Sequence, residues 1–555
     1  MSRTVKHRRR SGRRTGVSRV VLATSALLSL GVTASAPAAS AQAAFPQRNT
    51  SAESTPRPGG TGSGTPPAIS WHKCADDWDV GSKWKCGTLE TPLDHRDPSK
   101  GTLKLAVAKL PADDPKKRIG SLIMNPGGPG GSGIEDADSE GWPTYATNEV
   151  TKRFDLVTYD PRGVGHSSPP LNCKRQTPRP RVLQEADTEH ESPRTEQEML
   201  DQLKDKDSTG ADCVKNAGWL VPYMSTVDNV HDLDRLRRAV GDAKLNYLGI
   251  SYGTTIGAVY ANMYPKRVRS LILHGVVDAR TQMNNAAAFS LSEAKGGEKT
   301  VKAMLKACDL DAKHCAFQRH AEKKFHRLAH HLGAARSSNA ASTDTWNRFV
   351  DLAYAFKAPG SAGKAAQGLQ RLYEKTFPPA KGVAATKNAE PAKNDPPENN
   401  NEEDVLETTD CLDLPPLPEQ YGPWLKRFKK ARAEAPVFGP AEVVTDITCR
   451  DWPEKYRAAL PRHTGPWDRA KTPILMMNQQ SDWSTPLRWA RNMTHALGQR
   501  GLVVINGFGH GVPTDCSRRW TQNHLLHSAV PTGTVRCDDG NTTPFSRKGA
   551  GARRP

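Results

Sequence analysis

Short apolar runs alternate with segments of helical spacing in the first half of the chain. The runs that we expect to form buried strands span residues 103–108, 121–125, 154–160, 245–248 and 270–274. Strands that alternate with helical segments predict a mostly parallel sheet with crossover helices.

Two helices are predicted between these strands. In the first, apolar residues recur at the period of one helix face; they are Val227, Val230, Leu233, Leu236 and Val240. We expect Thr226 to be the N-cap of this helix. The second helix is expected from about Thr254 to Tyr264, and Pro265 ends it.

The pattern changes between residues 280 and 445, which are rich in Ala and Lys, read as helical and lack clear strand runs. Residues 378–404, rich in Pro and Asn, are expected to form a mobile loop. The strand pattern resumes at 474–478 and 502–505, with a helix between them that Thr485 and Pro486 are expected to cap and start. We interpret the middle segment as a helical lid inserted between two halves of one domain.

The first 41 residues have the layout of an export signal. Eight basic residues precede an apolar run from Val20 to Val32, and small-residue cleavage sites follow it. The run is shorter than the about 20 apolar residues that a membrane anchor needs. We therefore expect a secreted protein without stable membrane insertion, and Arg13 with Arg14 keeps a twin-arginine route open beside the general secretory one.

The expected organisation has six parts. They are a signal peptide at 1–41, a disordered lead-in or propeptide at 42–68, the N-terminal part of the core at 69–279, the lid at 280–445, the C-terminal part of the core at 446–540 and a disordered tail at 541–555.

Charge and cysteine content narrow the class of protein. The net charge of +19 falls to +11 without the signal, with 70 basic against 59 acidic residues. No Lys/Arg stripe interleaved with aromatic residues occurs in the sequence, so we predict no nucleic-acid partner. We expect the protein to be a monomer.

Ten cysteines fit an oxidising compartment. Short loops close at the smallest entropic cost, so we favour bonds between cysteines that are neighbours in the sequence. The favoured pairs are Cys74 with Cys86, Cys173 with Cys213, Cys308 with Cys315, Cys411 with Cys449, and Cys516 with Cys537. A zinc site is the competing interpretation, but the sequence has no C-x-x-C, and we expect no metal.

Three motifs in a fixed order point to a reaction. Residues 249–253 read Gly-Ile-Ser-Tyr-Gly between a predicted strand and a predicted helix, which is the context of a nucleophile elbow centred on Ser251. Asp482 follows a later strand, and His510 follows the last one in a glycine-flanked loop. Serine, acid and histidine in this order predict an α/β-hydrolase fold with a mostly parallel central sheet and an inserted, mainly helical lid.

Each member of this set has a role in acyl transfer. His510 is expected to take the proton of Ser251, and Asp482 to orient the imidazole. Asp278 is the rival acid because it follows the strand before the lid, whereas Asp515 comes after the histidine and does not suit the order.

The oxyanion hole needs two backbone N–H groups. We expect one from Tyr252 and the other from the glycine loop at 125–133, at Gly127 or Gly128. The same loop matches a dinucleotide fingerprint, but two prolines interrupt the match and no acid follows at the expected distance. We predict no cofactor.

Two further groups of residues are expected to be structural. Asp160 and Arg162, in the turn after a strand, are expected to pair with each other and hold the loop. His326 and His330 lie four residues apart on a lid helix, with His314, His320 and His331 nearby, and we interpret them as a solvated basic face.

Taken together, the motifs resemble those of the secreted tripeptidyl aminopeptidases of Streptomyces-type bacteria, α/β-hydrolases related to prolyl aminopeptidases. The resemblance spans most of residues 69–540. It rests on the glycine loop, the turn at 160–163, the elbow, the Asp482 segment through Thr485-Pro486, the His510 loop and the cysteines Cys411 and Cys449.

The resemblance also implies where the substrate binds. In the family, a Glu before the first of those cysteines meets the free N-terminus of the substrate. Here that residue is Asp410, with Glu407 and Asp413 as alternatives. A second departure is His274, where relatives often have Asp.

We therefore predict a secreted serine exopeptidase that releases short peptides, as tripeptides on the family pattern, from substrates with a free N-terminus. The first alternative is a carboxylester hydrolase that uses the same triad, since one fold serves both reactions. The second is a basic envelope-binding protein with an inactive hydrolase fold.

Overall fold

The computed structural model describes residues 68–546 except 79, 138–140, 175–190, 206–208, 335–339, 379–400, 454–455 and 457–460. The predicted signal peptide and almost all of the lead-in lie outside the described residues, as do residues 547–555 of the tail and most of the predicted loop at 378–404.

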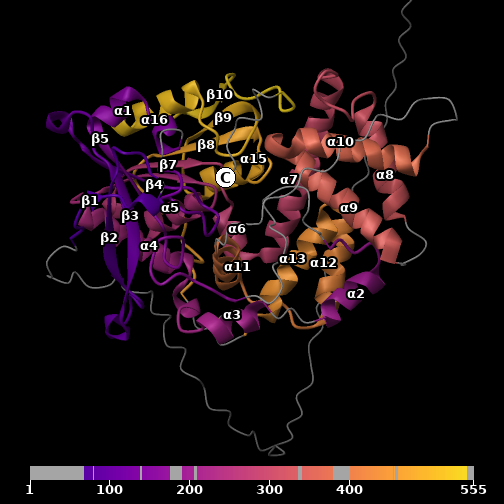
Figure 1. Cartoon of the computed structure of the whole chain (residues 1–555), viewed down its shortest axis with the longest axis horizontal. Coiled ribbons are helices and arrows are strands. Elements are labelled where there is room, and N and C mark those ends of the chain that lie inside the picture. Colours follow the sequence, from indigo (N-terminus) through magenta and orange to yellow (C-terminus); the bar gives the residue numbers. More distant parts are fainter. Residues whose placement is uncertain are drawn as a thin grey trace, which may run out of the picture. The chain divides into compact units, whose positions relative to one another are not determined.

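A ten-stranded sheet organises the core, in the order β1-β2-β3-β5-β4-β6-β7-β8-β9-β10 (Figure 1). The first three strands join antiparallel, and β5 through β10 pair in parallel. The strands are β1 (His72–Lys73), β2 (Lys85–Pro92), β3 (Thr102–Leu110), β4 (Gly120–Asn125), β5 (Phe154–Tyr159), β6 (Leu245–Ile250), β7 (Val268–His274), β8 (Ile474–Ser481), β9 (Gly501–Phe508) and β10 (Gly533–Cys537).

Helices cover both faces of this sheet. Every residue of β4, β5 and β6 is buried, so these strands read as continuous apolar runs rather than as alternating ones. Alternate residues enter two separate hydrophobic clusters. One cluster includes α4 (Thr226–Ala239), α5 (Tyr252–Met263) and α15 (Leu487–Ala496), and the other includes α1 (Asn148–Arg153) and α16 (Asp515–His527). The predicted mostly parallel central sheet is confirmed, and the structure adds that helices cover both of its faces.

Two predicted helix starts are wrong by one residue, and both differences matter for the site. The N-cap of α4 is Ser225, whose side chain accepts the N–H of Asp228. Thr226 is instead the first helical residue, and its buried hydroxyl contacts Tyr252 and Asp413. Helix α15 begins at Leu487 with Pro486 at the N-cap position, and the Thr485 side chain does not cap it.

Between β7 and β8 the described residues are helical. They form α6 (Ala279–Asn284), α7 (Ala286–Leu310), α8 (Ala321–Gly333), α9 (Ala340–Lys357), α10 (Pro359–Thr376), α11 (Glu402–Asp413), α12 (Tyr421–Glu434) and α13 (Gly439–Asp451). Helices α7 to α10 share a hydrophobic cluster of their own, separate from the two sheet clusters. Helix α13 extends across the expected boundary at residue 445.

The helices between β7 and β8 form a helical layer. This layer also includes a segment that the sequence predicts to belong to the core. Helix α2 (Glu196–Lys204) contacts α12 and α13, and α3 (Thr209–Ala217) contacts α13. The disulfide Cys173–Cys213 joins α3 to the segment after β5. Residues from both sides of the nucleophile elbow therefore build the helical layer.

All five favoured disulfides are present: Cys74–Cys86, Cys173–Cys213, Cys308–Cys315, Cys411–Cys449 and Cys516–Cys537. Residues 541–546 differ from the expected disordered tail. Asn541 forms a β-bridge with Phe508. The buried ring of Phe545 packs against that of Phe356 in the cluster of α7 to α10, with 5.6 Å between the ring centroids.

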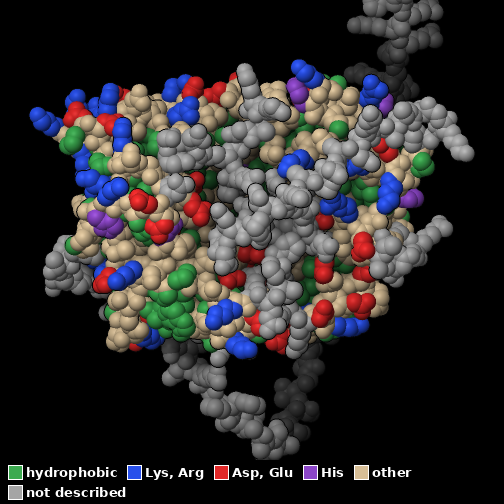
Figure 2. All heavy atoms as spheres, in the orientation of Figure 1, with side chains coloured by type: hydrophobic (Ala, Val, Ile, Leu, Met, Phe, Trp, Pro, Cys, Tyr) green, Lys and Arg blue, Asp and Glu red, His purple; other side chains and the backbone are tan. Residues whose placement is uncertain are grey.

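Basic and acidic side chains are interspersed over the described surface on the face drawn in Figure 2. None of the described helices has the length and apolar character that crossing a membrane requires.

Candidate active site

Ser251 lies at a sharp turn between β6 and α5. Its backbone has φ 53° and ψ −125°, a conformation that a non-glycine residue adopts only under constraint. A Cβ at Gly249 would lie 2.3 Å from the carbonyl oxygen of Gly253, and one at Gly253 would lie 2.7 Å from that of Asn125. The crowding explains both glycines of the motif. The Ser251 N–H donates to the carbonyl of His274 at 3.2 Å, which fixes the elbow to β7.

His510 and Asp482 are in direct contact. The imidazole Nδ1 lies 3.0 and 3.1 Å from the two carboxylate oxygens, and both side chains are buried. Asp482 Oδ1 also accepts the N–H groups of Ser484 and Thr485. A carboxylate held in this way favours the tautomer with a proton on Nδ1, so that Nε2 is left as the base. The Thr485 hydroxyl lies 3.2 Å from the same Nδ1, which is where the side chain goes instead of capping α15.

The histidine loop packs against the elbow. A Cβ at Gly275, directly after His274, would lie 3.1 Å from His510 Cε1, and one at Gly511 would lie 2.4 Å from Ile250 Cγ2. These contacts place His510 beside the strand ends that carry Ser251. Within the described residues, the hydrogen bonds of the imidazole go to Asp482 and Thr485, and none joins it to Ser251. In serine hydrolases this bond often tightens only when substrate binds.

The glycine loop after β4 lies against the elbow. A Cβ at Gly127 would lie 2.9 Å from both Ser251 Cβ and the backbone nitrogen of Tyr252. The N–H of Gly127 already donates to Asn125 Oδ1 at 3.1 Å. Tyr252 is the first residue of α5, so its N–H lacks an intrahelical acceptor. Of the two glycines, Gly128 is therefore the better second donor beside Tyr252.

The rival acids have other partners. Asp278 caps α6 by accepting the N–H of Thr281, and its second oxygen accepts from Asn492 Nδ2 at 2.7 Å. Asp515 lies in the first turn of α16 and pairs with Arg518. The structure brings Asp482, and neither of these carboxylates, to the histidine.

The expected pairing of Asp160 with Arg162 is wrong. Asp160 accepts from the Ser132 hydroxyl and from the N–H groups of Ile134 and His166, so it holds the glycine loop. Arg162 is fully buried and binds both carboxylate oxygens of Asp232, at 2.7 and 2.8 Å.

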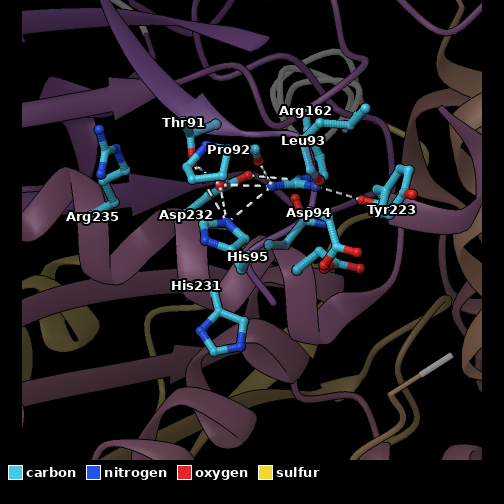
Figure 3. A network of polar contacts seen from close by, with 12 residues as sticks. Thr91, Pro92, Leu93, Asp94, His95, Arg162, Tyr223, His231, Asp232 and Arg235 are labelled. Atoms are coloured by element: carbon cyan, nitrogen blue, oxygen red, sulfur yellow. Dashed lines mark hydrogen bonds and ion pairs between the residues drawn. The ribbon is translucent and has the colours of Figure 1, made fainter. Parts of the chain in front are cut away.

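Around this ion pair, a network of polar contacts ties the β2 end to α4 (Figure 3). Asp232 also accepts from Thr91, and His95 Nε2 lies 2.8 Å from it. The Arg162 guanidinium donates to the carbonyls of Leu93 and Tyr223. The buried guanidinium thus has hydrogen-bond acceptors for its Nε and both terminal nitrogens, and it joins the turn after β5 to α4 and to the segment after β2.

The three candidate substrate carboxylates lie on one face of α11, because positions three apart share a helix face. Asp413 is buried and accepts both the N–H and the hydroxyl of Thr226, whose Oγ1 lies 2.6 Å from the Tyr252 hydroxyl. Asp413 is thereby tied to the elbow. Burial raises its pKa to about 7.

Asp410 comes one helical turn before Asp413 and is partly exposed. Enclosure by the surrounding protein and the nearby Asp413 and Asp446 carboxylates raise its pKa to about 8. Glu407, another turn along, adds to this repulsion. Asp413 is occupied by its contact with Thr226, whereas the described side chains give Asp410 a single hydrogen bond, from Gln282.

Sequence reasoning missed three polar residues near this face. Gln282 of α6 donates its Nε2–H to Asp410 Oδ1 at 3.2 Å. Glu293 of α7 and Lys357 of α9 interact electrostatically with each other, and Lys357 also with Asp482. They stand in no motif, since each meets its partners across more than 60 residues of chain.

Comparison with known proteins is consistent with this geometry. The model of the alpha/beta hydrolase fold family matches residues 120–513. The chain belongs to the α/β-hydrolase fold family. The match extends from β4 to the loop that carries His510, and so includes all three candidate triad residues.

The chain is also similar over most of its length to curated members of the family. It is 28% identical to a tripeptidyl aminopeptidase of Streptomyces lividans, over 84% of this chain and 86% of the relative. It is 28% identical to "Serine protease Hip1" of Mycobacterium tuberculosis, over 81% and 87%. It is 25% identical to "Carboxylesterase B" of Mycobacterium tuberculosis, over 85% and 90%. Family and relatives together identify a serine hydrolase.

The chain also matches solved structures, at much lower sequence identity than these relatives. The crystal structure of esterase E22 is 14% identical, with a TM-score of 0.34 over 80% of this chain and 98% of that one. A likeness of this size carries no functional argument.

Proposed function

We propose that the protein is an exported serine exopeptidase that releases short peptides, tripeptides by analogy with its relatives, from free N-termini. Similarity over more than four-fifths of the chain to two relatives named tripeptidyl aminopeptidase supports the peptidase class. The predicted signal and the five disulfides support export to an oxidising compartment.

In the proposed reaction, His510 Nε2 takes the proton of Ser251 Oγ, which attacks the scissile carbonyl carbon. Asp482 accepts the Nδ1–H of His510 and stabilises the imidazolium. The N–H groups of Tyr252 and Gly128 hold the oxyanion. The imidazolium then protonates the leaving amine, the acyl-enzyme forms on Ser251, and a water activated by His510 hydrolyses it.

One observation carries the exopeptidase assignment. A partly exposed carboxylate, Asp410, lies on the α11 face whose next turn is bonded through Asp413 and Thr226 to Tyr252, the proposed oxyanion donor. The α-ammonium of a peptide, with a reference pKa of about 8, is mostly charged at neutral pH. Its positive charge would lower the raised pKa of Asp410 when the peptide binds, and so favour the ionised carboxylate that complements it. Glu407 is the alternative partner one turn further from the elbow.

The test compares one peptide anilide with a free N-terminus and the same anilide after N-acetylation. We expect the free peptide to be cleaved with a kcat/KM at least about tenfold higher, since acetylation removes a charged hydrogen bond worth about 1.5–3 kcal/mol and adds bulk. Equal rates for the two anilides would exclude the exopeptidase. Mass spectrometry of the products gives the number of residues released.

The competing function is a carboxylester hydrolase. It is favoured by the similarity to the relative named Carboxylesterase B, which covers as much of the chain as the peptidases do. This function predicts that short acyl esters without an amino group are turned over faster than any free peptide amide. The same pair of anilides, assayed beside such an ester, separates the two.

A further inference from the structure

Gln282 donates a side-chain hydrogen bond to Asp410. It belongs to α6, only 6% of it is exposed, and its Nε2–H donates to Asp410 Oδ1 at 3.2 Å. The ionised form of Asp410, which a bound ammonium would favour, only accepts hydrogen bonds, in agreement with the Gln282 NH₂ group that faces it. The amide oxygen then points away from that contact.

The amide oxygen of Gln282 lacks a hydrogen-bond donor among the described residues. Gln282 Oε1 is buried and makes no hydrogen bond to any described residue. A buried acceptor without a donor costs about 1–3 kcal/mol, so such atoms in a native structure call for an explanation. Here the unsatisfied oxygen belongs to the same amide group whose NH₂ donates to the Asp410 carboxylate, so the two acceptors are separated by that amide group alone.

The position of Gln282 is fixed relative to the nucleophile. The Val277 N–H donates to Thr254 Oγ1 of the elbow helix at 3.0 Å, and Asn492 of α15 holds Asp278 at the start of α6. Figure 1 shows α6 between the sheet and the helical layer, next to α11. A group bound at Gln282 and Asp410 would therefore be held at a constant distance from Ser251.

We propose that Gln282 determines specificity for a primary ammonium: its Oε1 accepts one N–H of the substrate's N-terminus while the Asp410 carboxylate accepts another. The inference rests on the proposed exopeptidase function, because it concerns the same ammonium. An α-ammonium brings three N–H donors and satisfies both acceptors. An acetylated terminus brings one donor without charge, and a dimethylated terminus brings one donor with charge.

Two substitutions separate binding of the substrate from support of Asp410. Gln282→Met removes the acceptor and keeps the length of the side chain. Gln282→Glu keeps an acceptor but removes the N–H that reaches Asp410. We expect Gln282→Met to lower kcat/KM for the free-amine anilide about 10- to 100-fold, the equivalent of one hydrogen bond to a charged group, mainly through KM. We expect Gln282→Glu to stay within about threefold of the wild type.

A matched control is Gln197→Met. Gln197 of α2 also donates its Nε2–H to an aspartate, Asp201, at 2.9 Å, but at an exposed site. It should leave kcat/KM unchanged. Hydrolysis of p-nitrophenyl acetate, which has no amino group, reports whether each variant keeps a folded and competent triad.

A second measurement on the wild type covers the case in which Gln282→Met fails to fold. One anilide is prepared with zero, one, two or three methyl groups on its charged nitrogen, which gives three, two, one or no N–H donors. Two acceptors predict a small loss from zero to one methyl and a drop of about tenfold or more from one to two. In a folded Gln282→Met, that step should be at least threefold smaller.

The outcomes are distinct. If Gln282→Glu loses as much as Gln282→Met, or if Gln282→Met equals the wild type, Gln282 is not a ligand of the ammonium. A methyl series that declines evenly, without a step at the second methyl, also overturns the inference. Equal cleavage of acetylated and free anilides by the wild type would instead remove the proposed function itself.

Discussion

Asp482 and Asp278 follow neighbouring parallel strands, and at the residue scale only their hydrogen-bond partners separate them. Asp482 binds His510 and two backbone N–H groups, whereas Asp278 caps α6 and binds Asn492. The order of motifs along the chain favours Asp482, and the contact with the imidazole supports that choice.

Substitution of each carboxylate by its amide gives the first prediction. Asp482→Asn should lower kcat by about 10⁴-fold, because the amide stabilises the wrong histidine tautomer while the geometry stays intact. Asp278→Asn should keep kcat within about tenfold, since that side chain has no contact with His510. Steady-state kinetics on one anilide checks both variants, and the reverse ranking would move the acid to Asp278.

The raised pKa of Asp410 has a consequence for stability. In the unfolded chain the pKa of this carboxyl is its ordinary value of 3.8, whereas in the folded protein the pKa is about 8. Between these values the folded state binds more protons, so the stability that Asp410 contributes falls as the pH rises from about 4 to about 8.

Asp410→Asn should remove this loss. We expect the variant to be more stable than the wild type at pH 9, by on the order of 1–2 kcal/mol in the free energy of unfolding, and about equal to it at pH 4. Urea denaturation at the two pH values measures the difference. A variant that is destabilised equally at both would show that the Asp410 carboxylate is paired by a cation in the folded protein.

At the scale of elements, α11 carries Asp410, the proposed ligand of the substrate ammonium, and connects it to the core of the protein. Its last turn reaches Thr226 of α4 through Asp413, and the disulfide Cys411–Cys449 attaches it to α13. The two contacts hold the helix from opposite sides, and so they fix the direction in which Asp410 faces.

Removal of that disulfide gives the element-scale prediction. The double substitution of Cys411 and Cys449 by Ser should lower the free energy of unfolding by about 2–4 kcal/mol. It should also raise KM for the free-amine anilide more than for p-nitrophenyl acetate, because α11 loses a constraint and the triad does not. The same substitution at Cys308 and Cys315, which close a short loop in the helical layer, is the control and should leave the ratio of the two KM values unchanged.

How far the sequence determines these elements depends on the range of their contacts. The strands β4, β5 and β6 were predicted because complete burial makes most of their residues apolar. Strand β2 was missed, because its burial alternates within a polar sequence, as was the edge strand β10, which is mostly exposed. The N-cap of α4 was predicted one residue too late, at Thr226 instead of Ser225. Ser is the better N-cap by type, and the Thr226 hydroxyl contacts the Tyr252 hydroxyl instead.

The residues of the candidate site also divide into those that local sequence reveals and those that depend on distant contacts. Ser251, Asp482 and His510 stand in motifs that local sequence reveals. The role of Gln282 depends on a contact with Asp410 across 128 residues, and the helices α2 and α3 join the helical layer through contacts with α12 and α13 more than 200 residues away. No local period reports such contacts, so they emerge only from the folded chain.

At the scale of the whole molecule, helices α7 to α10 have a hydrophobic cluster separate from those of the sheet. The segment 541–546, which follows β10, contributes Phe545 to this cluster. Phe545 is 8% exposed and packs against Phe356 of α9. The C-terminal segment of the chain therefore connects the last part of the core to the inserted helices.

Phe545→Ala tests this connection. We expect the free energy of unfolding to fall by about 3–5 kcal/mol, as for other aromatic residues truncated in a core. Thr543→Ala, at an exposed neighbouring position, should have an effect within about 0.5 kcal/mol. Thermal unfolding followed by circular dichroism compares the two, and a pair of equal melting temperatures would show that the segment contributes nothing to the inserted helices.

The attachment of α6 and α11 to the elbow has one more consequence. Thr254 holds the segment that leads to Gln282, and Thr226 holds the helix that carries Asp410, so the proposed amine site and the attacking hydroxyl belong to one rigid frame. The span between them, and with it the length of the fragment cut from a substrate, would then be fixed by α6, α11 and the elbow. Every peptide product would keep the same number of residues, whichever side chains it carries.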